Sequence, residues 1–389
     1  MKVLLLGVGL QGKAALYDLA TSPLVSHVIA ADVDLTGVRP LLERLPADRV
    51  TAVQMDVRQP NLLETYLQQV DAVVALLPKT LRLEVAPRVI HSGVHFVETS
   101  YALPEYQALG EEAAARGVTL LPEFGLDPGI DLVLAGRAVR ELDEVHELHV
   151  YGTGVPEPKA ANNPLKYKIS WTFAGVLSAY QRPARMMQDG QIVELTPAQM
   201  FSPEYVRLMD VEGIGRMEAY YNGDAVRYLD VFGVRDTVRS TGRYTLRWPG
   251  HSAFWKVLVE LGFLNEEPIE VAGTPVVPRQ FVHDLLAPQL QYAPDERDIA
   301  AIRVEAVGLK DGRQKRIVYQ MVDYRDLETG FLAMQRTVGF TASIGAQMIL
   351  RGDIQKRGLL APGRDVPSDV LIAELQKRGI EVKRWEDEV

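Results

Sequence analysis

Val3-Leu4-Leu5-Leu6-Gly7-Val8-Gly9-Leu10-Gln11-Gly12 is the stretch that decides the fold. The apolar run before the glycines is typical of a buried strand, and the stretch after them is typical of a helix. Gly7 permits a tight strand-to-helix turn, Gly9 lets the backbone approach a pyrophosphate, and Gly12 lets the helix pack against the strand. The phosphates then lie at the helix N-terminus, where N–H groups favour anions. This turn, with Leu10 and Gln11, therefore predicts a dinucleotide-binding site.

A second apolar run ends at Asp32, about twenty positions beyond the last glycine, as the motif requires. A carboxylate at the end of this strand accepts hydrogen bonds from ribose hydroxyls and repels a 2′-phosphate. Asp32 therefore predicts NAD rather than NADP as the cofactor. Asp32 or Asp34 can also cap the helix that follows, and both roles hold if Asp32 contacts ribose and Asp34 forms the cap.

Length and composition limit the class of protein. A chain of 389 residues with 47% hydrophobic and 24% charged residues predicts two domains, each with its own core. The net charge of −9, without a dense Lys/Arg run, argues against binding to nucleic acid or an anionic membrane. The lack of cysteine excludes disulfides and a cysteine nucleophile, and the histidine spacing predicts no metal site. We expect a cytoplasmic protein without a membrane span.

Residues 1–125 alternate strand-like and helix-like segments, as in a Rossmann-type doubly wound parallel sheet. The pattern changes in residues 126–335, which predict a second, α+β substrate domain. Residues 336–389 begin with an apolar helix that needs a surface to bury it, so we expect them to return to the first domain. The predicted fold class is therefore α/β with two domains.

Ligands of a doubly wound sheet bind at the carboxyl ends of its strands. The residues predicted to contact the cofactor there are Asp56, Val57, Leu77, Pro78 and Ser100.

Ser100, Tyr101 and Asp127 follow the fifth and sixth predicted strands, so two hydroxyls and a carboxylate are expected on the nicotinamide side. Such a cluster can bind an ammonium group and exchange its proton. We therefore predict that all three contact the substrate, and that Tyr101 and Asp127 are the catalytic acid/base groups. Asp127-Pro128-Gly129 is also a common turn in which the aspartate caps the next helix, and this alternative stays open.

Longer motifs extend along nearly the whole chain. They include Val97-Glu98-Thr99-Ser100-Tyr101, Glu123-Phe124-Gly125-Leu126-Asp127-Pro128-Gly129, Asn163-Pro164-Leu165-Lys166-Tyr167-Lys168 and Thr245-Leu246-Arg247-Trp248-Pro249-Gly250-His251. Together these motifs resemble the saccharopine dehydrogenase family, in its saccharopine reductase and lysine 6-dehydrogenase branch. The resemblance implies an NAD(P)-binding domain and hydride transfer at a C–N bond of lysine, saccharopine or a carboxylated polyamine.

The second domain supplies candidate groups for binding an amino-acid substrate. A carboxylate needs a cationic partner, and arginine matches its geometry better than lysine because the guanidinium can donate two parallel hydrogen bonds. Tryptophan side chains can line a site for an aliphatic chain. Solvated surface positions for the basic residues and a hydrogen-bonded structural role for the histidine stay open as alternatives. The substrate-binding candidates are Lys166, Lys168, Trp171, Arg247 and His251.

The chain departs from saccharopine reductases at positions that bear on the substrate. Ala174 and Gly223 stand where those enzymes carry arginines, and Arg82 replaces a histidine. The predicted function is therefore an NAD-dependent dehydrogenase, working as a homodimer, on the C–N bond of lysine or an N-substituted amino acid such as saccharopine. Alternatives are a lysine 6-dehydrogenase that forms a cyclic imine and ammonia, a cofactor-bound sensor, or a polyamine synthase-like protein without net turnover of NAD.

Overall fold

The computed structural model describes residues 1–388, which form two compact units. Unit 1 contains Met1–Arg137 and Gln335–Glu381, and unit 2 contains Ala138–Met334 and the residues from Val382 onward. The first boundary thus lies within helix α6 rather than at residue 125. The segment after residue 121 stays with unit 1 because Phe124 donates its N–H to the carbonyl of Glu98, at the end of a neighbouring strand.

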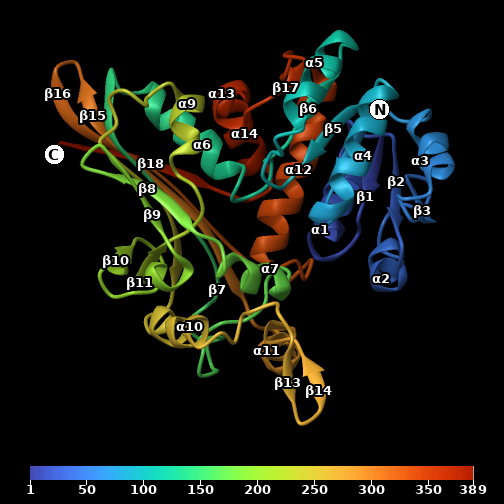
Figure 1. Ribbon diagram of the computed structural model, residues 1–389. Helices are drawn as coiled ribbons and strands as arrows, with labels where there is room; N and C mark the ends of the chain where they lie inside the picture. Colours follow the sequence, from blue (N-terminus) through green and yellow to red (C-terminus); the bar gives the residue numbers. More distant parts are fainter. Residues whose placement is uncertain (389) are drawn as a thin grey trace. The chain divides into compact units, whose positions relative to one another are not determined.

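Unit 1 is a parallel sheet of seven strands with helices packed beside it (Figure 1). The strand order is β17-β6-β5-β4-β1-β2-β3. β1 (Lys2–Leu6) lies between β4 and β2, and residues 3–6 are fully buried. Their uninterrupted apolar run follows from this position, since both faces of a central parallel strand are covered. The predicted doubly wound α/β fold is confirmed.

The remaining elements of unit 1 follow the predicted alternation, apart from the edge strand β17, which comes from the C-terminal segment and pairs with β6. The strands are β2 (His27–Asp32), β3 (Val50–Gln54), β4 (Ala72–Ala75), β5 (His95–Glu98), β6 (Thr119–Leu121) and β17 (Gly358–Leu359). The helices are α1 (Leu10–Thr21), α2 (Arg39–Leu42), α3 (Pro60–Leu67), α4 (Lys79–His91), α5 (Tyr106–Ala115), α6 (Ile130–Arg140), α12 (Ala333–Arg351), α13 (Pro362–Asp365) and α14 (Ser368–Lys377).

Helix α12 packs directly on α1, the helix that follows the glycine turn. A Cβ atom on Gly339 of α12 would lie 2.5 Å from the carbonyl oxygen of Gln11, so only glycine allows this approach. The side-chain amide of Gln335 donates to the carbonyl of Leu10 at 2.7 Å. The apolar helix predicted after residue 336 therefore braces the start of α1.

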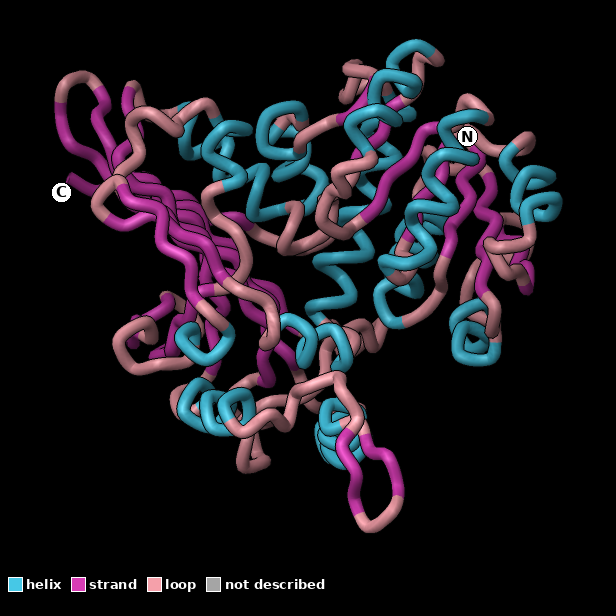
Figure 2. Tube along the Cα trace, viewed as in Figure 1, coloured by secondary structure: helices cyan, strands magenta, loops and turns pink. Residues whose placement is uncertain are grey.

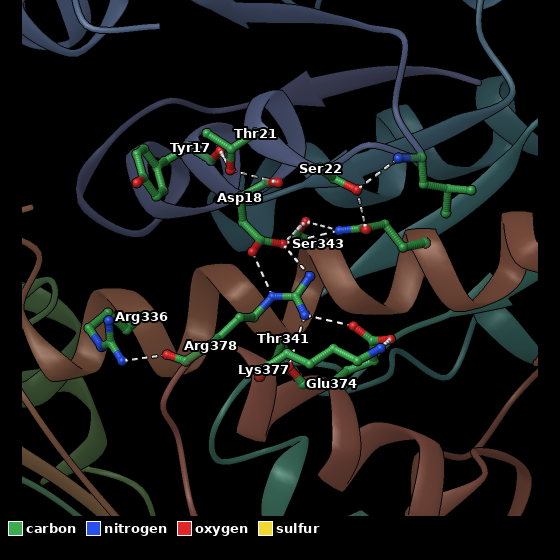
Figure 3. Close-up of polar contacts among 12 residues, drawn as sticks. Tyr17, Asp18, Thr21, Ser22, Arg336, Thr341, Ser343, Glu374, Lys377 and Arg378 are labelled. Atoms are coloured by element: carbon green, nitrogen blue, oxygen red, sulfur yellow. Dashed lines mark hydrogen bonds and ion pairs between the residues drawn. The ribbon is translucent and has the colours of Figure 1, made fainter.

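A buried polar network joins α1 to the C-terminal helices (Figure 3). Arg378, directly after α14, donates from Nε and Nη2 to the carboxylate of Asp18 at 2.6 and 2.9 Å. Its Nη1 donates to the carboxylate of Glu374 at 2.7 Å. Ser343 and Gln347 of α12 donate to Asp18 at 2.6 and 3.1 Å. This network therefore links the N-terminal and C-terminal segments of unit 1 through the carboxylates of Asp18 and Glu374 and the guanidinium of Arg378.

Unit 2 is built on a mixed sheet whose long strands run side by side (Figure 2). Its main path is β10-β11-β12-β7-β15-β16-β18, with β8 pairing to β12 and β9 pairing to β8. β7 and β12 are parallel, and β15 is antiparallel to β7. The predicted second, α+β domain is therefore a large mixed sheet with short helices.

The bounds of unit 2 show longer strands than the sequence pattern indicated. Its strands are β7 (Glu144–Pro156), β8 (Ala184–Gln188), β9 (Gln191–Leu195), β10 (Arg207–Val211), β11 (Gly215–Tyr221), β12 (Ser240–Arg247), β15 (Asp298–Lys310), β16 (Arg313–Tyr324) and β18 (Val382–Glu388), with a separate hairpin of β13 (Ile269–Val271) and β14 (Thr274–Val276). Its helices are α7 (Phe173–Ala179), α8 (Pro197–Met200), α9 (Arg227–Phe232), α10 (His251–Glu260) and α11 (Pro278–Leu286).

The last strand corrects the prediction that residues 336–389 return to the first domain. Gln335–Glu381 lies in unit 1, but β18 pairs antiparallel with β16 in unit 2. Charge explains this pairing, because Lys315 and Arg316 of β16 face Glu388 and Asp387 in register. Such cross-strand pairs of opposite charge stabilise a sheet edge.

Candidate functional site

The glycine turn has the geometry that a pyrophosphate requires. Gly7 has a φ of 89° and donates its N–H to the carbonyl of Ala31 at 2.9 Å. A Cβ atom on Gly12 would lie 2.0 Å from the Gly7 carbonyl oxygen, whereas a Cβ atom on Gly9 would meet nothing within 4 Å. No side chain caps the N-terminus of α1. Open space beside uncapped N–H groups fits an anionic phosphate group.

Asp32 lies at the end of β2 and also fixes the glycine turn. Its Oδ2 accepts the N–H of Val8 at 2.7 Å, and its Oδ1 accepts the N–H of Asp34 at 3.2 Å. Asp34 in turn accepts the N–H of Thr36 at 2.8 Å, where a short 3-10 helix begins. Asp34 thus forms a turn just before this helix, whose N-cap residue is Leu35, and Asp32 adds a loop-fixing role that the motif alone does not reveal.

The other residues predicted to contact the cofactor lie in varied surroundings. Asp56 forms an ion pair with Arg58 at 2.7 Å, and hydrogen bonds from Arg58 lower the pKa of Asp56. Val57 is buried in the core of unit 1. Leu77 is half-buried, and Pro78 is exposed at the residue before α4. Asp56 thus already has a cationic partner, which the sequence did not predict.

The structure brings together the backbone at the ends of β5 and β6. Glu123 donates its N–H to the carbonyl of Ser100 at 3.0 Å, and its carboxylate accepts the N–H of Ala102 at 3.2 Å. Ser100, Tyr101 and Asp127 are all half-buried. At the start of α6, Asp131 accepts the N–H of Gly129 at 2.6 Å.

A buried ion pair lies beneath the Ser100–Tyr101 segment. Nη1 of Arg82 donates to both carboxylate oxygens of Glu98 at 2.9 Å and to the carbonyl of Tyr101 at 3.1 Å. Burial raises the pKa of Glu98 to about 7, although Arg82 opposes the shift. Arg82 appeared in the sequence only as a departure from a family pattern. Here it supports the backbone of a predicted catalytic residue.

Unit 2 buries one of its predicted carboxylate clamps deeply. Arg247, the last residue of β12, is 6% exposed. Its Nη1 donates to the carbonyl of Leu246 at 3.0 Å, while its Nε–H has no partner. Within the described residues, Arg247 forms no ion pair with a carboxylate, and the Tyr167 ring lies against its guanidinium. A buried cation without a carboxylate is costly unless an anion joins it.

Three buried tyrosines surround this arginine: Tyr167, Tyr180 and Tyr220. The Tyr167 ring centroid lies 5.4 Å from the Arg247 Cζ, and the Tyr167 hydroxyl has no partner. Burial raises the pKa of Tyr167 to about 12, so its hydroxyl stays protonated. Burial alone would lower the pKa of Arg247, but the tyrosines outweigh it and raise that pKa. The cluster therefore presents a fixed positive charge and hydroxyl donors.

The remaining predicted substrate groups differ in exposure. Lys168 is committed to Glu296, with Nζ 2.6 and 2.5 Å from the two carboxylate oxygens, which leaves it poorly suited to clamp a substrate. Lys166 is exposed, in a loop with a φ of 48°. Trp171 is half-buried and packs against the core cluster of Tyr167. His251 is 4% exposed and contacts the Tyr180 hydroxyl at 2.8 Å.

Sequence patterns missed the tyrosines at positions 180 and 220 and the partner of Lys168. Tyr167 lay within a quoted motif, but nothing in its spacing pointed to Arg247. No group of three or more His, Asp or Glu side chains in residues 1–388 could hold a metal ion. In the same range, no helix combines enough length and apolarity to cross a membrane.

Two family models match the chain along most of its length. The "Saccharopine dehydrogenase NADP binding domain" matches residues 3–121, and the "Saccharopine dehydrogenase C-terminal domain" matches residues 125–380. The chain belongs to the saccharopine dehydrogenase family. This confirms the resemblance, and the predicted class, an NAD(P)-dependent dehydrogenase, is that of the family. Residues 3–121 are accordingly a nicotinamide dinucleotide-binding domain.

Relatives of this saccharopine dehydrogenase family member agree with the assignment. "Alpha-aminoadipic semialdehyde synthase" of Arabidopsis thaliana is 28% identical over 86% of this chain, which spans 38% of that protein. "Saccharopine dehydrogenase [NADP(+), L-glutamate-forming]" of Saccharomyces cerevisiae is 26% identical over 98% of both chains. The solved structure of the apo saccharopine dehydrogenase (L-Glu forming) from Saccharomyces cerevisiae superposes with a TM-score of 0.86 at 25% identity, covering 99% of each chain.

Proposed function

We propose that this protein is an NAD-dependent dehydrogenase that acts on the C–N bond of lysine or of an N-substituted amino acid such as saccharopine. The observation that carries the proposal is Arg247, a buried guanidinium without a carboxylate among the described residues of unit 2. An amino-acid substrate supplies the missing anion through its carboxylate, which matches the fork of an arginine. The family and the dinucleotide-binding domain supply the redox class.

The chemistry divides between the cofactor and the side chains. When bound at the glycine turn of unit 1, the cofactor would supply the acceptor for the hydride that leaves the carbon next to the amine nitrogen. The substrate amine must first lose a proton, and Tyr101 and Asp127 are the proposed groups that bind and exchange it. Loss of hydride leaves a C=N⁺ bond, to which water adds. The C–N bond then breaks and releases an aldehyde and an amine, or ammonia when the substrate is lysine.

Unit 2 contributes binding rather than proton transfer in this proposal. Arg247 holds the carboxylate, and the Tyr167 hydroxyl is the neighbouring donor without a partner. Among the buried basic residues there, Lys168 is already neutralised by Glu296. Arg243, the other buried arginine among the described residues of unit 2, lies over the ring of Tyr228. Arg247 is then the cation proposed to bind a carboxylate at the tyrosine cluster, which favours a substrate with one carboxylate there, as lysine has, over one with several.

The experiment incubates the purified protein with NAD and, separately, with lysine, saccharopine and carboxylated polyamines, and follows NADH absorbance. We expect NADH with lysine or saccharopine. Product analysis then distinguishes the reactions: ammonia and a cyclic imine mark a lysine 6-dehydrogenase, whereas glutamate or lysine marks cleavage of saccharopine. No formation of NADH with any of these amines would contradict the proposal. Tight binding of NAD without any NADH formation would support a cofactor-bound sensor instead.

Asp32 makes a separate prediction about the cofactor. Replacing Asp32 with asparagine removes the charge that repels a 2′-phosphate but keeps an oxygen that can accept the N–H of Val8. We expect the ratio of kcat/KM for NADP to that for NAD to rise about tenfold or more. This corresponds to the loss of about 1.4 kcal/mol of repulsion between the carboxylate and the 2′-phosphate. Steady-state kinetics with both cofactors measure this ratio.

Asp34→Asn is the matched control, because Asp34 lies two residues away and accepts a backbone N–H, that of Thr36, in the neighbouring turn. It should leave the cofactor ratio unchanged. A wild-type protein that already prefers NADP, as the name of the yeast relative states for that enzyme, would refute the NAD part of the proposal alone.

A further inference from the structure

The backbone that carries Tyr101 is held at three consecutive residues. Glu123 donates its N–H to the carbonyl of Ser100 at 3.0 Å, and its Oε1 accepts the N–H of Ala102 at 3.2 Å. Between these two bonds, Nη1 of Arg82 donates to the carbonyl of Tyr101 at 3.1 Å. Loops at active sites are often the parts of a fold that open most easily. These three bonds instead fix the course of the chain on both sides of Tyr101.

Glu123 makes both of its bonds from a backbone conformation that is uncommon for glutamate. Its φ is 58°, in the left-handed region that favours glycine, and the residue is 5% exposed. Such a conformation costs free energy and persists only where the surrounding structure holds it. Strained residues of this kind cluster at functional sites, so the backbone of Glu123 points to a role in the reaction.

The residue after Glu123 anchors it against the end of β5. Phe124 donates its N–H to the carbonyl of Glu98 at 2.9 Å and is fully buried. Its ring packs on α12, where a Cβ atom on Gly345 would lie 2.5 Å from Cδ1 of Phe124. The loop after β6 is thus held between the end of β5 and α12, which leaves Glu123 little room to shift.

Arg82 acts on the same segment from helix α4. It is 3% exposed, and its Nη1 donates to both carboxylate oxygens of Glu98 at 2.9 Å. Glu98 is fully buried, so the two charges compensate each other inside unit 1. Because Glu98 sets the direction of the guanidinium, Arg82 is a fixed donor to the carbonyl of Tyr101. Two separate elements, α4 and the loop after β6, therefore fix the position of one residue.

We propose that Glu123 and Arg82 are positioning residues that hold the Tyr101 hydroxyl in place to exchange a proton with the substrate amine. This inference rests on the proposed function and assigns neither residue a contact with the substrate. Proton transfer requires the two heavy atoms to lie within hydrogen-bond reach, and a displacement of about 1 Å can lower the rate about a hundredfold. Bonds that fix the backbone of the reacting residue therefore contribute to the rate without touching the substrate.

The test compares two substitutions of Glu123. Glu123→Gly removes the carboxylate and suits the left-handed backbone, so it reports the lost bond to Ala102 rather than new strain. We expect kcat for the amine to fall about a hundredfold, while KM for NAD stays near the wild-type value. Glu123→Gln keeps an oxygen that can accept the N–H of Ala102 and should recover most of the activity. Asp189→Gly is the matched control, because Asp189 has a φ of 49° but is exposed in the turn between β8 and β9.

Coupling between positions separates positioning from direct contact with the substrate. Tyr101→Phe removes the hydroxyl that is being positioned, so adding Glu123→Gly to it should lower kcat no further. If the two effects multiply instead, Glu123 acts on the substrate or on the fold as a whole, and the proposal is wrong. A rise in KM for NAD alongside the fall in kcat would overturn it as well, because unit 1 would then be generally loosened.

Arg82 is tested together with its ion-pair partner. Arg82→Met by itself leaves the buried carboxylate of Glu98 without a cation, so it is combined with Glu98→Gln. We expect this double variant to lower kcat about tenfold or more, and to have no effect in the presence of Tyr101→Phe. An unchanged kcat would overturn the role of Arg82. Circular dichroism checks the fold, and Arg82→Lys, which keeps the charge without the fork, replaces the double variant if that one does not fold.

A measurement without turnover keeps this inference distinct from the proposed function. Protein loaded with the reduced cofactor cannot oxidise lysine, so calorimetric titration reports binding alone. Glu123→Gly should bind lysine about tenfold more weakly than the wild type and Glu123→Gln, whereas hexanoate, which lacks the amines, should bind all three equally. If no amine is oxidised but this pattern is found, the proposed function fails and the positioning role stands. Equal binding of lysine by all three proteins, no binding by any, or an equal loss for hexanoate would overturn the positioning role.

Discussion

Replacing Arg247 with methionine is expected to lower kcat/KM for the amine substrate by about a thousandfold without destabilising the protein. The loss follows because the substrate carboxylate would enter a buried site without its cation, and truncating one partner of a buried charge pair costs about 2–5 kcal/mol. Steady-state kinetics should show the effect mainly in KM for the amine, with KM for NAD unchanged. Arg247→Lys should recover only part of it, because a point charge cannot form the fork.

Stability decides between a binding role and a structural role for this arginine. In the absence of substrate, Arg247 is a desolvated cation without a carboxylate among the described residues. Replacing such a group with an apolar side chain of similar volume is neutral or stabilising. The unfolding midpoint of Arg247→Met should therefore equal or exceed that of the wild type. A variant that lost both activity and stability would show that the arginine maintains the fold.

Arg216→Met is the control for the loss of a positive charge in unit 2. The Arg216 side chain is 62% exposed, on β11. Its ion pair with Asp210 has a separation of 4.0 Å, at the limit of such contacts. Exposed pairs contribute little, so both kinetics and stability should stay at the wild-type values.

The second large effect is expected for Arg378→Met, which should destabilise the protein by about 3–5 kcal/mol. The substitution leaves the buried carboxylate of Asp18 without its cation and removes the bond to Glu374 (Figure 3). Urea unfolding followed by circular dichroism measures the change. Hydrogen exchange should also quicken in α1, because Asp18 belongs to that helix.

Lys377→Met is the matched control for Arg378→Met. Lys377 is the neighbouring residue and bonds the same Glu374 carboxylate at 2.8 Å, but its side chain is 67% exposed. Its loss should cost less than about 1 kcal/mol. Equal destabilisation by the two variants would mean that the buried contacts of Arg378 add nothing to the surface pair.

The free energy of unfolding should fall at low pH because of the same network. Burial would raise the pKa of Glu374, but hydrogen bonds from Lys377 and Arg378 outweigh it and hold that pKa at about 2. A folded-state pKa below the ordinary value of 4.5 means that the contribution to stability is complete above pH 4.5 and is lost as pH falls toward 2. The same fall should be shallower in Arg378→Met.

Unit 1 could be predicted from the sequence because each of its sequence patterns is short and local. Gly7, Gly9 and Gly12 determine the backbone of one turn, and the apolar side chains of residues 3–6 by themselves indicate a buried strand. The strand order of such a sheet then follows from short right-handed connections. The seventh strand, β17, was not predictable, because it arrives from beyond residue 350 and is two residues long.

The polar partners could not be predicted, since pairing between distant residues leaves no periodic trace in the sequence. Lys168 looked like a clamp, yet its charge is neutralised by Glu296, 128 positions away. Asp18 and Arg378 are 360 positions apart. Arg247 was named from its motif, but its lack of a carboxylate became visible only when its neighbours were in place.

The division of unit 1 between the two ends of the chain has a consequence for biosynthesis. Met1–Arg137 leaves the ribosome first, but α12, β17 and Arg378 follow only after all residues up to Met334 have been made. At about 5–20 residues per second, this delay is on the order of ten to forty seconds. During it, the nascent dinucleotide-binding half has an uncovered sheet edge at β6 and an unneutralised Asp18. Unit 1 is thus begun before unit 2 but completed only near the end of synthesis, and until then its exposed edge and its unneutralised carboxylate are what chaperones would have to shield.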